Sequence, residues 1–249
     1  MLIIWYLLSL PKPLFNDSTS TVLIDRNRIL LGAHIAKDEQ WRFPYNDSVP
    51  KKFKLSIIQF EDRQFYRHPG FNPFAFSRAL FQNIKARKIV SGGSTLTMQV
   101  IRLSRKGKPR TVFEKVIEVI LATRIELAYS KDEILALYAS NAPFGGNVVG
   151  LDAASWRYFG RSAEKLSWSE TATLAVLPNA PSLIFPGKNK KLLEAKRNRL
   201  LDRLYEKEII DSLTCYLSKQ EPLPGKPFPL PRHASHLLNR AEKEGSKGK

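Results

Sequence analysis

The sequence predicts a mainly α domain that is preceded by a small β element. Two β-rich runs flank a polar turn near the N-terminus, and helix-capping patterns recur beyond residue 50. Hydrophobic residues make up 43% of the 249 residues and charged residues 25%, a globular composition. The single cysteine, Cys215, excludes an internal disulfide framework and a cysteine-based zinc cluster.

The N-terminal region divides into two predicted segments. Residues 1–10 (MLIIWYLLSL) form an apolar run of half the length that a membrane-spanning helix needs. We interpret them as a partial membrane anchor, with a buried core segment as the alternative. Residues 11–49 form a β-containing lead-in, in which residues 19–32 predict a hairpin with its turn at residues 25–28.

Local signals place the helices and the loops that follow. Helices are predicted from 73 to about 88, from 94 to about 102, and over 189–207. Residues 220–231 are Pro-rich and predict an extended segment, and residues 241–249 predict a disordered tail or a cut linker. The predicted N-caps are Asn72, Ser94, Thr111, Ser130 and Ser167, the last three as capping boxes with a glutamate three residues on.

Positive charge is concentrated in one stretch. Lys and Arg number 40 against 23 Asp and Glu, a net charge of +17, so the surface attracts nucleic acid, an anionic membrane or a phosphorylated substrate. Residues 85–110 hold eight basic residues and no acid. Within them, Gly92-Gly93 lead into a hydroxyl-capped helix start, which can hold a phosphate. A glycine turn beside a solvated basic face is the alternative.

Two further segments carry candidate chemistry. Residues 61–70 (EDRQFYRHPG) combine carboxylates, a histidine and aromatic residues that can raise the pKa of a catalytic carboxylate. A helix end with local ion pairs is the alternative. Lys115 and Glu118 are three residues apart and therefore share a helix face, as they also would in a plain surface ion pair.

These segments occur in a characteristic order. EDRQFYRHPG, GGSTLTMQ, EKVIE, KDEILALY, FGGN, ASWRYFG and SETATLAVLPNAPS together resemble the peptidoglycan glycosyltransferase domain of class A penicillin-binding proteins, a lysozyme-like transglycosylase family. The resemblance is strong over residues 50–186 and is greatest to the 1C branch. It implies a lysozyme-like glycosyltransferase domain at 50–218. Residues 219–249 would then be a Pro-rich and basic linker towards an absent transpeptidase domain.

The resemblance also implies a reaction and its residues. Lipid II would be polymerised into β-1,4-linked glycan with inversion and release of undecaprenyl pyrophosphate. Glu61 matches the general base, and Glu118 matches the second catalytic carboxylate, near the donor pyrophosphate. The implied substrate-binding residues are Asp62, Arg63, Phe65, His68, Ser94, Thr95, Gln99, Arg102, Lys115, Arg124 and Tyr138.

The resemblance implies partners and a location as well. No metal ligand and no cofactor are expected, with a divalent cation such as Mg²⁺ at the pyrophosphate as the alternative. The expected partners are lipid II, the growing glycan, the inner-membrane surface and other cell-wall synthesis proteins. The domain would lie on the periplasmic face of the cytoplasmic membrane.

Two positions depart from the family pattern. Glu114 stands where many members carry Arg, and Ser140 stands where Asn is usual. They suggest a second hypothesis, a catalytically weakened domain that acts as a cell-wall assembly partner. A lysozyme-like lytic enzyme is a third. A nucleic-acid binder is disfavoured, because the aromatic residues fall in helical core patterns or in the EDRQF motif.

Overall fold

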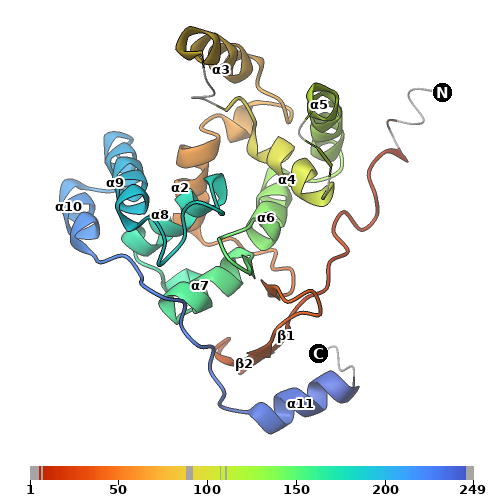
Figure 1. Cartoon of the computed structure of the whole chain (residues 1–249), viewed down its shortest axis with the longest axis vertical. Helices are drawn as coiled ribbons and strands as arrows, with labels where there is room; N and C mark the ends of the chain where they lie inside the picture. The colour runs from red at the N-terminus through yellow and green to blue at the C-terminus, as the bar shows by residue number, and fades with distance from the viewer. Residues whose placement is uncertain (1–5, 7, 88–91, 107, 110, 245–249) are drawn as a thin grey trace. The chain divides into compact units, whose positions relative to one another are not determined.

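The structure, a computed structural model, describes residues 6, 8–87, 92–106, 108–109 and 111–244. It confirms the predicted fold class, mainly α with a small N-terminal β element (Figure 1). The chain divides into two compact units, and each is described by itself. Unit 1 comprises Met1–Asn16 and Glu61–Tyr138, and unit 2 comprises Asp17–Phe60 and Ala139–Lys249.

Unit 1 is built around one buried helix. Its elements are the last residue of α2 (Lys51–Glu61), a 3₁₀ turn at Phe65–Arg67, α3 (Pro73–Ala86), α4 (Leu96–Ser104), α5 (Val112–Glu126) and most of α6 (Lys131–Asn141). The first six residues of α4 are all buried, including Thr97 and Gln99. A helix that is buried all round forms a core, and here α5 packs against it.

Unit 2 begins with the predicted hairpin. Strands β1 (Thr21–Ile24) and β2 (Leu30–His34) pair antiparallel, with Thr21 opposite His34 and an irregularity after Leu23. The turn is held by Asp25, whose Oδ1 accepts the backbone N–H groups of residues 27 and 29 at 2.8 and 2.7 Å. Two short strands, β3 (Trp41–Arg42) and β4 (Val148–Val149), pair in parallel.

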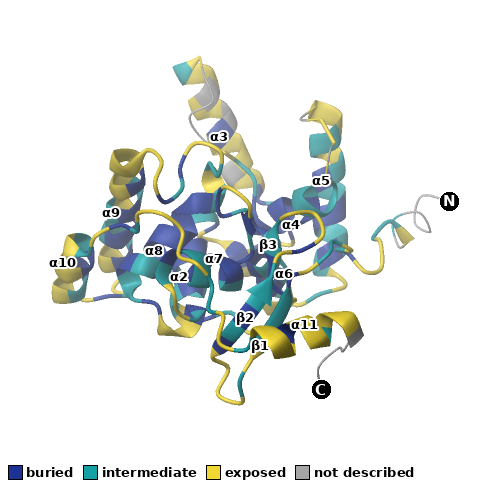
Figure 2. Ribbon diagram, turned by 60° about the horizontal axis from the view of Figure 1, so that its bottom comes forward, coloured by how far each residue is buried: buried dark blue, intermediate teal, exposed yellow. Residues whose placement is uncertain are grey.

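The rest of unit 2 is helical and centres on α8. Its elements are α7 (Leu151–Phe159), 3₁₀ turns at Ala163–Lys165 and Leu177–Asn179, α8 (Trp168–Val176), α9 (Lys190–Glu206), α10 (Ser212–Gln220) and α11 (Ser235–Glu244). Seven of the nine residues of α8 are buried, and α7, α9 and α10 pack against it (Figure 2). The outward face of α9 is charged and exposed, so α9 closes the core on that side.

Two of the predicted capping boxes form as expected. At α8, the Glu170 N–H donates to Ser167 Oγ at 3.1 Å and the Ser167 N–H donates to the Glu170 carboxylate at 2.9 Å. The same exchange joins Ser130 and Glu133 before α6, at 3.3 and 2.7 Å. Each box satisfies backbone donors that the first helical turn leaves without partners.

Two other predicted caps differ in the structure. The N-cap of α4 is Thr95 and not Ser94, because the Thr95 hydroxyl accepts the Met98 N–H at 3.1 Å. Before α5, the Thr111 hydroxyl accepts the Glu114 N–H at 3.1 Å. The reciprocal bond is not made, since the Glu114 carboxylate pairs with Arg105 instead, so this capping box is only half formed.

The predicted partial anchor, residues 1–10, lies largely outside the described residues. Tyr6 is helical, and its hydroxyl hydrogen-bonds to Thr123 Oγ1 of α5 at 3.0 Å. In the described part of the chain, no helix has both the length and the apolar character needed to cross a membrane.

The C-terminal segment packs against the hairpin. Residues 241–244, predicted as disordered, belong to α11, and residues 245–249 lie outside the described part. Leu238 of α11 is buried, and a Cβ placed on Gly32 would lie 3.3 Å from it. His34 Nδ1 and Glu242 Oε2 are 2.7 Å apart. Tertiary packing on β2 therefore outweighs the local signal of a polar, charged sequence.

Replacing Arg197 with Leu should lower the free energy of unfolding by about 2–4 kcal/mol. Arg197 is only 1% exposed, and its guanidinium donates to the carbonyls of Glu221 at 2.7 Å and Lys219 at 3.0 Å. Leucine would leave these acceptors without their donor. Urea unfolding measures the loss. The matched control, Arg199→Leu on the exposed face of the same helix, should change it by no more than about 0.5 kcal/mol. Equal effects of the two substitutions would contradict this role.

Candidate active site

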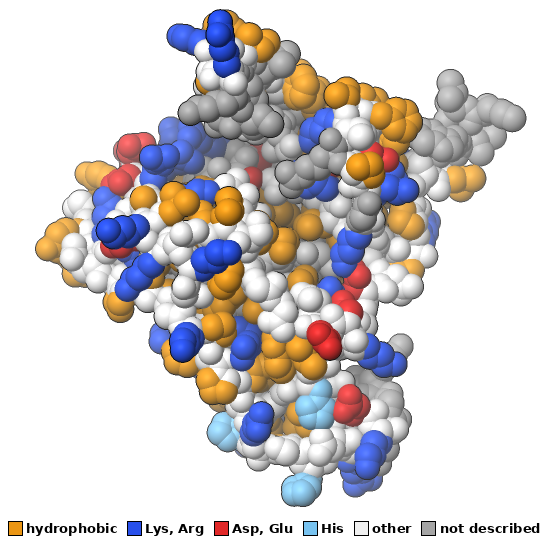
Figure 3. All heavy atoms as spheres, in the orientation of Figure 1, with side chains coloured by type: hydrophobic (Ala, Val, Ile, Leu, Met, Phe, Trp, Pro, Cys, Tyr) orange, Lys and Arg blue, Asp and Glu red, His pale blue; other side chains and the backbone are white. Residues whose placement is uncertain are grey.

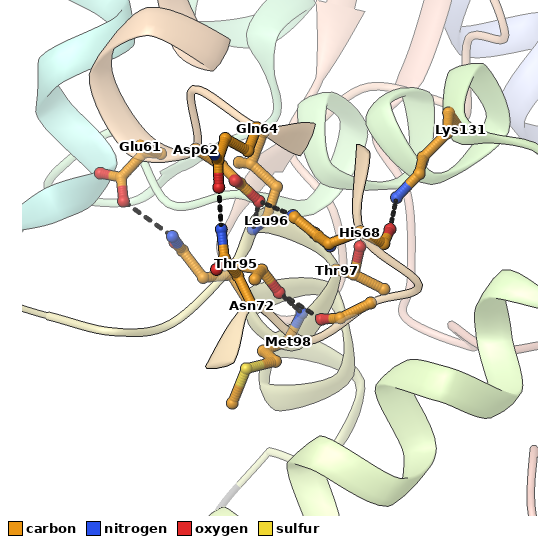
Figure 4. A network of polar contacts seen from close by, with 12 residues as sticks. Glu61, Asp62, Gln64, His68, Asn72, Thr95, Leu96, Thr97, Met98 and Lys131 are labelled. Atoms are coloured by element: carbon orange, nitrogen blue, oxygen red, sulfur yellow. Dashed lines mark hydrogen bonds and ion pairs between the residues drawn. The ribbon is translucent and has the colours of Figure 1, made fainter. Parts of the chain in front are cut away.

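Glu61, the predicted base, ends helix α2 and is held by Gln99 of α4. Gln99 Nε2 donates to Glu61 Oε2 at 2.7 Å, and Gln99 is buried (Figure 4). Tyr138 of α6 is 1% exposed, and burial raises its pKa well above the usual value. The Glu61 carboxylate raises it further, while Arg102 lowers it. The structure therefore brings these four predicted site residues into one electrostatic neighbourhood.

The neighbouring Asp62 ties this helix end to α4. Asp62 Oδ2 accepts the backbone N–H of Leu96 at 3.0 Å and the Nε2–H of His68 at 2.9 Å. Both side chains are buried, with 5% and 6% exposure. A carboxylate at a helix N-terminus is favoured by the helix dipole. Asp62 and His68, predicted to bind substrate, thus hold α4 beside Glu61.

A tight turn brings the intervening loop against the same helix. Thr95 Oγ1 donates to the Gly70 carbonyl at 2.6 Å. Gly70 has a φ of +88°, and a Cβ there would lie 2.3 Å from the carbonyl oxygen of Ala122 in α5. Any other residue would therefore force the turn away from α5. Thr95 is accordingly a structural cap as well as a predicted substrate contact.

Three residues that sequence reasoning missed complete this network. Lys131 Nζ donates to the His68 carbonyl and to Glu126 Oε1, each at 2.7 Å, and Thr97 Oγ1 donates to the same glutamate oxygen at 2.6 Å. The Lys131 ammonium also lies 4.6 Å from the centroid of the Phe65 ring. Lys131 opens the segment KDEILALY, and that was the only sequence signal that could have indicated it.

A second cluster joins three predicted residues around a cation. Lys115 Nζ donates to Ser94 Oγ at 2.7 Å and to Glu118 Oε2 at 2.8 Å. The Lys115 side chain is 32% exposed and that of Glu118 is 11% exposed. Lys115 is therefore fixed from two sides and still reaches solvent, as a cation that receives an anionic ligand must.

The remaining predicted residues are placed differently. Arg63 is exposed on the turn after α2, and Arg124 is half-buried in the last turn of α5. Phe65 is fully buried, with its ring edge-on to Tyr66 and His68. Phe65 therefore packs inside unit 1 and supports the site residues rather than facing solvent.

Both departures from the family pattern make structural contacts. In unit 1, the Glu114 carboxylate receives two nitrogens of Arg105, Nη2 at 3.0 Å and Nε at 3.3 Å. In unit 2, Ser140 Oγ accepts the backbone N–H of Asn46 at 3.4 Å. Glu114 thus connects the end of α4 to the start of α5, and Ser140 anchors the segment before α2.

The second cluster offers one carboxylate, that of Glu118, to the predicted divalent cation. Within the described residues, no three or more His, Cys, Asp or Glu side chains gather into a metal-binding group. Glu118 Oε2 already accepts a hydrogen bond from the Lys115 ammonium. A divalent cation at the pyrophosphate therefore stays a prediction, because the phosphate oxygens of the substrate would supply most of its ligands.

Comparisons with known proteins point to one family. Residues 30–205 match a family described as Transglycosylase. Penicillin-binding protein 1C of Escherichia coli (strain K12) is 39% identical over 225 residues, which are 90% of this chain and 29% of that protein. Penicillin-binding protein 1F of Bacillus subtilis (strain 168) is 36% identical over 163 residues, 64% of this chain and 23% of that protein.

A solved structure was also compared. The crystal structure of penicillin-binding protein 1A from Haemophilus influenzae gives a TM-score of 0.48 at 20% identity, over 92% of this chain and 24% of that one. This chain spans less than a third of each of these proteins. The family match and the sequence identities confirm the resemblance predicted from the ordered motifs, including its closeness to 1C proteins.

The Arg105–Glu114 pair should contribute about 0.5–1 kcal/mol to the stability of the protein. The two side chains are 28% and 16% exposed, so solvent screens much of their attraction. A double-mutant cycle of Arg105→Gln and Glu114→Gln, measured by urea unfolding, gives the coupling. Glu114→Arg should destabilise more than Glu114→Gln, because it places a second guanidinium against Arg105. A coupling of zero would contradict the predicted contribution of the pair to stability.

Proposed function

Because the chain belongs to the transglycosylase family, we propose that it is a peptidoglycan glycosyltransferase that polymerises lipid II into β-1,4-linked glycan strands. Undecaprenyl pyrophosphate leaves, and the configuration at the donor carbon inverts. One observation carries the proposal. In unit 1, the Glu61 carboxylate is held by the side-chain amide of Gln99. The Lys115 ammonium is held by the Ser94 hydroxyl and the Glu118 carboxylate.

Glu61 acts as the general base in this proposal. It takes the proton from the acceptor's 4-hydroxyl as that oxygen attacks the donor sugar. The bond from Gln99 Nε2 fixes one carboxylate oxygen, so the orientation of the base is set before the acceptor binds. Asp62 acts indirectly, because it accepts from the first N–H of α4 and so holds the helix that carries Gln99. Lys131 acts one step further away, since it binds Glu126, which accepts from Thr97 of α4.

The second cluster serves the leaving group. Departure of a pyrophosphate is favoured by fixed positive charge near the oxygen on which negative charge develops. Lys115 supplies it and is pre-oriented by Ser94 and Glu118. Arg102 stands one helical turn beyond Gln99 on α4 and adds a second cation near the base. No cofactor is required in this scheme.

The exposed surfaces of unit 1 suit a lipid-linked substrate. Large apolar side chains are exposed on α3, where Phe74 is 83% and Phe81 68% exposed, and on α5, where Phe113 is 71% exposed. Figure 3 shows Lys and Arg side chains close to hydrophobic ones on these helices. We place these faces at the outer surface of the cytoplasmic membrane, where an apolar surface with basic residues is stabilised.

The competing hypotheses predict different activities on lipid II and on finished peptidoglycan. A lytic enzyme would cleave finished peptidoglycan, whereas a glycosyltransferase would polymerise lipid II. A weakened assembly domain would do neither. The contacts of Glu114 and Ser140 give both departures a structural reason, so neither requires a loss of activity.

Glu61→Gln should reduce the rate of lipid II polymerisation by about 100- to 10,000-fold. The substitution removes the proton acceptor and keeps the volume, and the new amide oxygen can still accept from Gln99. The rate is measured with purified protein in detergent, and circular dichroism checks the fold. Glu164→Gln, at an exposed carboxylate of unit 2, is the control and should keep full activity. A Glu61→Gln protein with normal turnover would refute Glu61 as the base.

Lys115→Ala should weaken the binding of a phosphoglycolipid that mimics the donor by about 10-fold or more, since a charged hydrogen bond is lost. Arg102→Ala should act in the same direction. Lys165→Ala removes an exposed cation of unit 2 and serves as the control. Binding is measured by fluorescence polarisation of a labelled inhibitor. If both variants bind it as tightly as the control does, the phosphate site lies elsewhere.

A further inference from the structure

Unit 1 contains a groove at the C-terminal end of α4 that the proposed reaction does not use. Its volume is about 360 Å³, in the range of small-ligand sites. Residues 9–11 form one wall, and the C-terminal end of α4 and the middle of α5 form the others. The floor is apolar, built from Leu10, Ile101 and Leu121.

The rim of the groove is basic. Arg105, Lys106 and Lys108 line it, and among its described lining residues none is Asp or Glu. Arg105 is oriented from behind by the Glu114 carboxylate, which takes two of its nitrogens. Glu114, which does not line the groove, therefore fixes the direction of one rim cation. The two lysines are exposed and carry the remaining positive charge.

A site that combines an apolar floor with a cationic rim fits an amphiphile with an anionic head. Wall residues 9–11 include the last two residues of the apolar run of residues 1–10, and Leu8 is 76% exposed. The groove thus opens where the chain leaves the segment expected in the membrane, at the depth of lipid headgroups. The donor pyrophosphate is a weaker candidate, because its proposed cation, Lys115, belongs to a separate cluster.

We propose that this groove binds the phosphate headgroup of an anionic membrane phospholipid, with the first methylenes of an acyl chain over Leu10, Ile101 and Leu121. The proposal rests on the membrane location given under the proposed function. It does not depend on the transferase reaction. A bound lipid would hold the end of α4 at the membrane surface, five residues from Gln99 on the same helix.

The test measures binding of the full 249-residue chain to vesicles of phosphatidylcholine with and without phosphatidylglycerol, with no lipid II present. Lys106→Gln/Lys108→Gln should weaken binding to the anionic vesicles about 10- to 30-fold. The matched control, Lys190→Gln/Lys191→Gln, removes two exposed charges from α9 of unit 2 and should change it less than about threefold. Ser104→Phe, which blocks the groove without changing charge, should weaken binding about fivefold.

Three results would overturn the proposal. Equal losses of vesicle binding in the two double variants would mean that the basic surface as a whole attracts the anionic vesicles, without a specific site. Unchanged binding by a folded Ser104→Phe protein would show that the groove is not occupied, and full competition by glycerol phosphate would indicate a free phosphate as ligand. If the Ser104→Phe protein does not fold, cross-linking of the unaltered protein to a photoreactive phosphatidylglycerol replaces that measurement. Labelling within residues 9–11 or 101–108 supports the site, and labelling only elsewhere refutes it.

Discussion

The site depends on one buried carboxylate. Asp62 Oδ2 accepts from the first backbone N–H of α4 and from His68, and Asp62 directly follows Glu61 in the chain. A single oxygen therefore sets the distance between the end of α2 and the start of the core helix that carries Gln99 and Arg102. Because it is buried, this carboxylate is costly to leave unsatisfied, and both donors are provided by its own unit.

Sequence reasoning succeeded where the signal was local. The capping box at α8, the hairpin turn at Asp25, and the Lys115–Glu118 pair all lie within four residues along the chain, where local geometry decides the contact. It failed at Thr111, because a competing guanidinium nine residues earlier takes the Glu114 carboxylate. Such competition between elements has no local signature.

The ordered motifs named residues without indicating what each side chain contacts in the structure. The ordered motifs indicated Asp62, His68 and Phe65 as substrate contacts, yet the structure buries all three. A motif indicates that a residue is required. It does not indicate whether that residue touches a ligand or only positions another residue that touches it. Lys131 and Glu126 were missed for the complementary reason, since a half-buried ion pair between two helices resembles ordinary surface charge in a sequence.

The packing of α11 on the hairpin has a practical consequence for anyone who shortens this protein. Leu238 and Leu30 are both buried, and the backbone N–H of His233 donates to the carbonyl of Leu31 at 2.9 Å. A version that stopped after the Pro-rich segment would uncover an apolar strip along β2 and leave that carbonyl exposed. An uncovered strand of this kind pairs with other chains. Expression boundaries drawn before residue 235 would therefore favour aggregation, although they lie far along the chain from the catalytic motifs.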